Sequence, residues 1–244
     1  VFRITGWVDS VEHNYGVGYR NQRGQSFTYA GAIPGMPHGH LIVASLSCMD
    51  DVGFPQKDLV QHVEEHHPDL YLFLGDQLYE RVGGYGVENR NKLDYLRKWY
   101  LFGWTFRELI RNRPSVIIPD DHDVFHGNLW GAGGKAADVS HGYGYEAQDD
   151  GGYKQPASFV NMVHRTQTAH LPDPYDPTPV LQGISVYYTN LNYGGVSFAI
   201  LADRQWKSAP KAFFPDAEIE NGWPQNKSWN AKTQAYHPDA QLLG

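Results

Sequence analysis

The stretch that most constrains the fold of this chain is an apolar run, Leu70–Leu74, that stops abruptly at Gly75 and Asp76. A short run of this kind, rich in aromatic residues and bounded by glycine, predicts a strand buried on both faces, as in a parallel sheet. In open α/β sheets, ligand sites lie beyond the carboxyl ends of such strands. Because Asp76 lies at that point and Tyr79 follows it, we expect a carboxylate and a phenol placed to bind a metal there.

Two other segments repeat this design. Leu41–Ser47 is apolar and leads into Cys48, and Ser115–Pro119 leads into a DDHD run that contains Asp121 and His122. The three predicted buried strands therefore each end at side chains that can bind a metal. Helix-length segments separate them, and the order strand, helix, strand, helix, strand predicts a layered α/β fold.

Apolar residues recur at helical spacing in three segments, 55–66, 90–111 and 159–170, which we expect to be helices. Gly103 is a point where the second helix could kink or split. Two glycines at 194 and 195 predict a hairpin, and its second strand, Gly195–Ala202, is expected to be a fourth buried strand ending at Asp203 and Arg204.

The expected domain organisation has two parts. Residues 1–40 alternate in places and predict the end of an N-terminal antiparallel β unit, with a hairpin around Asn21–Gly24 and then a linker rich in Pro and Gly. Residues 41–244 are expected to form the catalytic domain. Within it, the glycine-rich segment 125–155 directly follows the DDHD run and is expected to form the rim of an active site.

Composition excludes some classes of function. The net charge of -7 argues against a nucleic-acid partner, because binding to nucleic acid depends on Lys and Arg that neutralise phosphates. No apolar run approaches the length of a membrane span. Cys48 is the single cysteine, so the sequence allows no internal disulfide, and this leaves the cellular compartment open.

Three short blocks resemble a known family. GDQLY at 75–79 resembles the GDxxY block of the calcineurin-like metallophosphoesterases, in the form seen in purple acid phosphatases. SCMD at 47–50 and DDHD at 120–123 resemble the PhoD-like alkaline phosphatases, where Cys replaces the first D-x-H block and DDH[DE] replaces GNH[DE]. The extension DDHDVFHGNLWG and the later segment Asp203–Gln205 are also similar, so the resemblance covers about residues 41–205. It implies a metallophosphoesterase-type sheet sandwich flanked by helices.

The resemblance implies a two-metal site. Asp76 would bridge both metals, and Cys48 and Tyr79 would complete the site of the first, a ferric iron. Asp121 would hold the second, a divalent ion for which we expect calcium, a hard cation suited to oxygen ligands.

The resemblance also implies roles in catalysis. His122 stands at the position of the catalytic histidine, and Asn128 and Arg204 are candidates to bind the substrate phosphate. Asp120 and Asp123 are expected to support His122 through hydrogen bonds rather than to contact metal. The implied activity is hydrolysis of small phosphomonoesters or phosphodiesters by a metal-activated hydroxide, and the family implies a periplasmic or secreted protein.

The chain also departs from this family. The family's later blocks, including a G-H-x-H segment, are absent, and His237 lies in an unrelated context, so we expect the C-terminal part of the domain to be missing. One alternative is a truncated or degenerate non-catalytic relative that binds a phosphorylated or carbohydrate ligand. Another is a glycoside hydrolase, which needs two acids at a defined separation and leaves Cys48 and Tyr79 unexplained.

Overall fold

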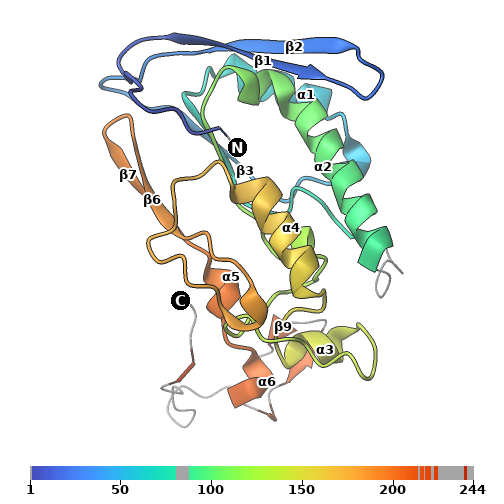
Figure 1. Cartoon of the computed structure of the whole chain (residues 1–244). Coiled ribbons are helices and arrows are strands. Elements are labelled where there is room, and N and C mark those ends of the chain that lie inside the picture. Colours follow the sequence, from blue (N-terminus) through green and yellow to red (C-terminus); the bar gives the residue numbers. More distant parts are fainter. Residues whose placement is uncertain are drawn as a thin grey trace.

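The computed structural model describes residues 2–80, 88–213, 215–216, 218–220, 223–224 and 239–240. His237 and the late apolar residues 241–243 lie outside the described residues. The described chain is a mixed α/β structure with one small parallel sheet, several antiparallel hairpins and helices packed around them (Figure 1).

The parallel sheet contains the three strands predicted from the sequence. Strands β3 (Val43–Leu46), β4 (Leu70–Phe73) and β5 (Ser115–Ile117) pair in the order β3-β4-β5, and each is shorter than the apolar run that predicted it. The register aligns Leu46 with Phe73 and Phe73 with Ile117. The three strands therefore end at one level, and the segments that follow them meet at one edge of the sheet.

The predicted helices are present with slightly different bounds. Helix α1 (Lys57–Glu65) connects β3 to β4, and helix α2 (Glu88–Arg111) leads towards β5 as a single helix that is not split at Gly103. Helix α4 (Ala157–Thr168) packs on the same side of the sheet (Figure 1). These helices cover one of the two faces that a parallel sheet must bury.

The two faces of the sheet carry alternate residues of β4 and β5, as the period of a strand requires. One face packs into the main core with residues of α2 and α4, and its members are Tyr71, Phe73, Ile117, Phe102, Phe106 and Phe159. The other face packs against the hairpin of β6 (Thr189–Tyr193) and β7 (Val196–Ile200), and its members are Leu70, Leu72, Val116, Ile118, Leu191, Phe198 and Ile200. The central strand is thus covered on both sides.

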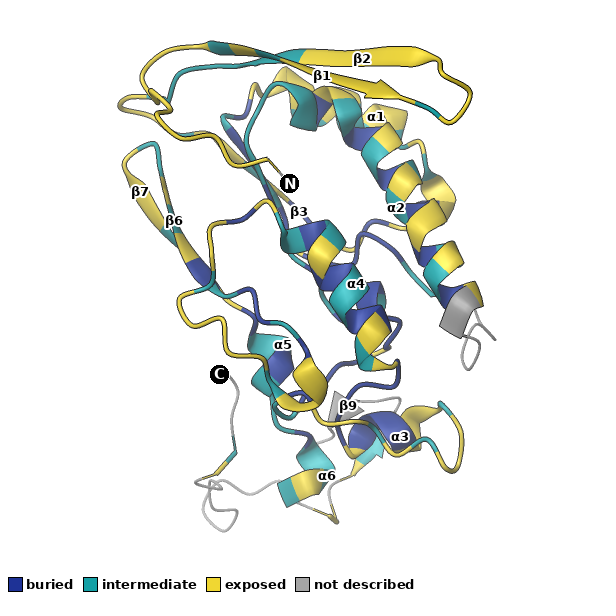
Figure 2. Cartoon of the chain, viewed as in Figure 1, coloured by how far each residue is buried: buried dark blue, intermediate teal, exposed yellow. Residues whose placement is uncertain are grey.

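Two of the four strands expected to be buried are largely exposed. In β3, Val43 and Ser45 are exposed, because β3 pairs with β4 on one side and is an edge strand among the described residues. In β7, Val196 and Ala199 are exposed, because β7 forms a separate two-stranded sheet with β6 instead of joining the parallel sheet (Figure 2). Apolar character predicted the strands, but it did not predict their neighbours.

The hairpin predicted around Asn21–Gly24 is confirmed. Strands β1 (His13–Arg20) and β2 (Ser26–Ile33) are antiparallel, and they lie across the end of α2 (Figure 1). Tyr15 and Tyr29 donate their hydroxyl protons to carbonyl oxygens of Arg111 and Arg107, at 2.6 and 3.3 Å. The hairpin therefore packs on α2 through the side chains of Tyr15 and Tyr29.

The remaining elements are short. They are helices α3 (Tyr145–Asp149), α5 (Asp203–Trp206) and α6 (Pro210–Phe213), the 3-10 turns Asp51–Gly53, His122–Val124 and Leu181–Gly183, and strands β8 (Ile219–Glu220) and β9 (Trp223–Pro224). Among the described residues, no helix has both the length and the apolar character needed to cross a bilayer.

Phe73→Ala is expected to lower the free energy of unfolding by about 3–5 kcal/mol, because a large cavity would remain in the core. The Phe73 ring is fully buried, with its centroid 5.1 Å from that of Phe102 and 5.3 Å from that of Phe106. Phe27→Ala, at an exposed ring of β2, is expected to cost less than about 1 kcal/mol. Urea denaturation measures both, and equal losses would contradict this account of the core.

His164→Gln is expected to make stability less dependent on pH. Burial lowers the pKa of His164 to about 4, while its ring donates from Nδ1 to the Ser185 carbonyl oxygen at 2.9 Å. As the pH falls, His164 therefore takes up a proton in the unfolded chain before it does so in the folded chain. The contribution of neutral His164 to the free energy of unfolding is complete above the unfolded pKa of about 6.5 and is lost as the pH falls towards 4.

The measurement is chemical denaturation at several pH values between these limits. The variant's stability should fall less steeply on acidification, by up to about 1.4 kcal/mol per pH unit. His62→Gln, at an exposed histidine of α1, is the control and should keep the original slope. An unchanged slope in His164→Gln would show that another group takes up the proton.

Candidate metal centre

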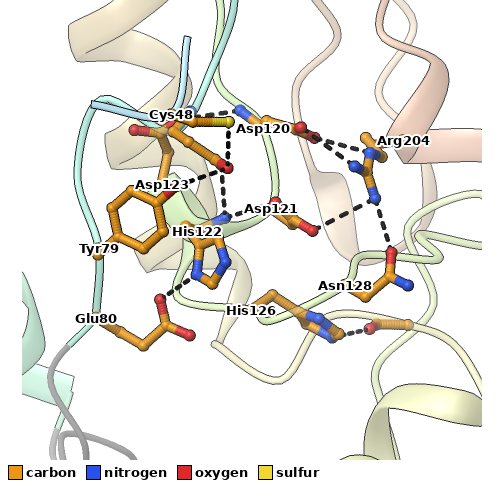
Figure 3. Close-up of polar contacts among 12 residues, drawn as sticks. Cys48, Tyr79, Glu80, Asp120, Asp121, His122, Asp123, His126, Asn128 and Arg204 are labelled. Carbon is orange, nitrogen blue, oxygen red and sulfur yellow. Dashed lines mark hydrogen bonds and ion pairs between the residues drawn. The ribbon is translucent and has the colours of Figure 1, made fainter. Parts of the chain in front are cut away.

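The candidate site lies at the edge where β3, β4 and β5 end (Figure 3). Backbone hydrogen bonds tie the segments after β3 and β4 together: Cys48 N–H donates to the Gly75 carbonyl at 3.2 Å, and Met49 N–H donates to that of Asp76 at 2.8 Å. This pairing continues the parallel ladder beyond the strands and brings Cys48 beside Asp76.

The backbone at these strand ends has unusual conformations. Cys48 and Asp76 have φ values of 54° and 55°, in the left-handed region that side chains other than glycine disfavour. Gly75, at φ 99°, passes so close to β5 that an added Cβ would lie 2.3 Å from the Asp120 Cβ. Glycine is therefore required at 75 for the strand ends to approach one another.

Two predicted ligands, Cys48 and Tyr79, meet at one carboxylate oxygen of a third, Asp76. Asp76 is buried, and its Oδ2 lies 3.6 Å from the Cys48 Sγ and 3.4 Å from the Tyr79 hydroxyl, both of which donate to it. Burial, together with the negative charge of Asp76, raises the pKa of the Tyr79 phenol well above its ordinary value. The structure thus places Cys48, Asp76 and Tyr79 together, as predicted.

Asp121 and His122 complete the cluster from the end of β5. Potential ligand atoms of Asp76, Asp121 and His122 all lie within 4.8 Å of one another. The His122 N–H donates to Asp121 Oδ1 at 3.0 Å and to Asp76 Oδ1 at 3.3 Å, which fixes the two carboxylates side by side. Burial raises the pKa of Asp121 to about 6, although Arg204 opposes the shift.

The residues present fit a metal. Two adjacent buried carboxylates are costly without a compensating cation, and in this structure the Arg204 guanidinium lies 3.4 Å from Asp121 Oδ2. A thiol and a phenol on the other side of Asp76 would add sulfur and oxygen donors. Soft sulfur at one end and hard carboxylate oxygens at the other could hold two different cations.

The two predicted substrate-binding residues are brought together beside this cluster. Arg204 lies in α5, and its Nη1 donates to the Asn128 Oδ1 at 2.9 Å. Its Nε lies 2.8 Å from Asp120 Oδ1 and its Nη2 donates to Asp120 Oδ2 at 3.2 Å, a two-point ion pair. Asp120 therefore orients Arg204. The prediction that Asp120 supports His122 was wrong, because the Asp120 carboxylate points to the arginine.

Asp123 has a different role from the one predicted. It is fully buried, and its Oδ2 accepts from the backbone N–H groups of Asp76 at 2.7 Å and Asp120 at 3.0 Å. Its Oδ1 accepts from Gln167 Nε2 of α4 at 3.0 Å. Asp123 thus holds the backbone of the strand ends, because these N–H groups have left the sheet ladder, and it does not bond to His122.

Glu80 supports His122 instead, and the sequence reasoning did not single it out. Its Oε2 lies 2.7 Å from His122 Nδ1, and the Tyr79 ring packs on the imidazole with ring centroids 4.3 Å apart. Burial would lower the pKa of His122, but the hydrogen bond and charge of Glu80 outweigh burial and raise it to about 9. The one sequence signal was an acid directly after Tyr79.

The start of the segment 125–155, which was expected to form the rim of an active site, lies beside the cluster. It supplies Asn128 to the arginine, and its His126 is buried with Nε2 donating to the Gly152 carbonyl at 3.1 Å (Figure 3). Burial lowers the pKa of His126 to about 3, so this histidine is neutral and braces the segment internally.

Comparison with known proteins adds no identification: no protein-family model matches the chain, and a search of curated proteins finds no match. The function is therefore argued from the geometry of the site.

Asp123→Ala is expected to destabilise the protein by about 2–5 kcal/mol, because it leaves two buried N–H groups unsatisfied at about 1–3 kcal/mol each. Asp150→Ala removes an exposed carboxylate from the segment 125–155 and is expected to stay within about 0.5 kcal/mol of the original protein. Urea denaturation measures both variants. If both lose the same small amount, Asp123 does not hold the strand ends.

Proposed function

We propose that this chain is a metal-dependent phosphoester hydrolase of the PhoD-like type, acting on small phosphomonoesters or phosphodiesters. The observation that supports this most is the convergence of Cys48 and Tyr79 on Asp76, beside Asp121 and His122, at the ends of parallel strands. The β6–β7 hairpin covers one face of the sheet and helices cover the other, an arrangement compatible with a metallophosphoesterase-type sandwich.

The proposed metals are ferric iron and a divalent ion, for which we favour calcium. Cys48, Asp76 and Tyr79 would hold the iron, since thiolate and phenolate donors suit it, and Asp76 and Asp121 would hold the divalent ion through carboxylate oxygens. When bound, such cations polarise a phosphoryl oxygen and lower the pKa of water.

Arg204 and Asn128 would bind the phosphate of the substrate. A guanidinium forms two parallel hydrogen bonds to phosphate, and Asp120 already fixes the plane of the Arg204 group. Asn128 contacts the same guanidinium, so its amide would lie beside the bound phosphate. The pair would orient the phosphorus atom towards the carboxylate cluster.

His122 would transfer a proton to the leaving oxygen. Glu80 accepts from the imidazole Nδ1–H at 2.7 Å, which sets the tautomer and orientation of the ring and leaves Nε2 for the substrate. The Tyr79 ring lies against the imidazole, with the ring planes tilted by 31°, and limits its rotation. Glu80 thus acts on the reaction through the histidine and is a positioning residue.

Asp76→Ala is expected to lose both bound metal and hydrolysis, because Asp76 is the carboxylate that the other candidate ligands share. Rates on p-nitrophenyl phosphate and bis(p-nitrophenyl) phosphate should fall by at least about 100-fold, since even residues behind the ligands cost 10–100-fold. Elemental analysis after reconstitution with iron and calcium measures the metal, and Asp150→Ala is the control.

The outcomes separate the hypotheses. Bound iron that is lost in Asp76→Ala, together with hydrolysis, supports the proposal. Bound metal without hydrolysis of either ester favours the non-catalytic alternative, in which the site binds a phosphorylated ligand. If the original protein binds no metal after reconstitution, the proposed metal centre is wrong.

A further inference from the structure

Helix α2 carries a row of exposed apolar side chains on the side turned away from the core. Leu93, Leu96, Tyr100 and Trp104 recur at intervals of three and four residues, which places them on one side of the helix. They are 69%, 42%, 66% and 53% exposed. Figure 2 shows exposed residues along the length of α2. We name these four residues the α2 stripe.

The four residues of the α2 stripe do not belong to the core-facing side of the helix. The opposite side of the helix already buries Tyr95, Phe102, Phe106 and Leu109. A surface helix is ordinarily polar on its outer side, so apolar residues on both sides indicate that the outer side is covered as well. The row is about 16 Å long, from Leu93 to Trp104 at 1.5 Å per residue. Such an exposed row is typical of an interaction surface.

Arginine side chains accompany the α2 stripe. Arg90 and Arg97 are exposed one helical turn to either side of Leu93, and neither forms an ion pair within the part of the chain that the structure describes. At the other end, the Arg107 guanidinium lies over the Trp104 ring at 4.3 Å, and Arg107 pairs with Glu108.

The charge of α2 is opposite to that of the whole chain. The helix contains six of the 20 Lys and Arg residues and three of the 27 Asp and Glu residues, although the chain has a net charge of -7. Lys98 is buried and pairs with Asp94, and Arg107 and Arg111 pair with Glu108. The positive charge beside the α2 stripe is therefore that of the exposed Arg90 and Arg97, and it matches a negatively charged partner.

We propose that the α2 stripe docks on an anionic lipid bilayer. Leu93, Leu96, Tyr100 and Trp104 enter the headgroup region, where the amphipathic rings of Tyr and Trp are favoured, and Arg90 and Arg97 contact lipid phosphates. Each basic residue near such a surface strengthens the attraction, and salt screens this contribution. The proposal does not depend on the metal centre.

A bilayer fits this surface better than a second copy of the chain. A standard protein interface uses about 20–30 residues on each side, whereas the α2 stripe offers four apolar side chains. Shallow insertion into headgroups needs a narrow apolar row with flanking basic residues, which α2 supplies.

The test is flotation of the full chain with vesicles of phosphatidylcholine alone and of phosphatidylcholine mixed with phosphatidylglycerol. Binding is expected for the anionic vesicles at low salt and is expected to weaken at high salt. The double variant Arg90→Glu/Arg97→Glu is expected to reduce the partition coefficient by at least about 10-fold. Tyr100→Ser/Trp104→Ser is expected to reduce it at both salt concentrations, because it removes apolar contact.

The matched control is Lys57→Glu/Arg165→Glu, which makes the same charge change at exposed residues of α1 and α4. It should retain most of the binding. The proposal is overturned if the original protein does not bind anionic vesicles, or if both charge-reversal variants lose binding equally. Concentration-dependent self-association that Tyr100→Ser/Trp104→Ser abolishes would instead assign the surface to a second copy.

Discussion

The site depends on one buried carboxylate. A single oxygen of Asp123 accepts the N–H groups of Asp76 and Asp120, which come from the ends of two neighbouring strands. Both groups have left the sheet ladder, and buried N–H groups without partners are costly. By satisfying both, Asp123 lets the chain leave two strands at one point without a loss of hydrogen bonding. These hydrogen bonds of Asp123 therefore set the positions of the candidate ligands on either side.

Charge shapes the rest of the site. The carboxylates of Asp76, Asp120, Asp121 and Glu80 lie near the imidazole of His122 and the guanidinium of Arg204. The imidazole of His122 pairs with Glu80. The guanidinium of Arg204 pairs with Asp120 and with one carboxylate oxygen of Asp121. Asp76 accepts hydrogen bonds from Cys48 and Tyr79. The unequal sharing leaves Asp76 and Asp121 as the carboxylates best able to attract a cation.

Sequence patterns predicted the parts of the fold that depend on local order. The apolar runs ending at Cys48, Asp76 and Asp120 predicted three parallel strands, because crossover helices lie between them and parallel strands end on one side. Spacing did not predict which strands would be edges, since β3 and β7 have core-like composition but exposed residues. Pairing partners come from tertiary contacts, which one sequence does not contain.

The same limit applies to the site. The residue types at the strand ends predicted the cluster itself, and the structure brings Cys48, Asp76 and Tyr79 together. The partners of charged side chains could not be predicted, because Glu80 and His122 are 42 residues apart, and Arg204 and Asp120 are 84 apart. Which acid meets which base depends on side-chain direction, and several acids stand close enough in sequence to compete.

The left-handed backbone at Cys48 and Asp76 has a consequence for how this protein could change over time. Such conformations cost of order 1–3 kcal/mol each for residues other than glycine. Selection for thermal stability alone would favour glycine at both positions and would remove the thiol and the carboxylate together. A variant selected only for heat resistance is therefore expected to lose both side chains, and a sequence that carries them does so at a cost in folding stability.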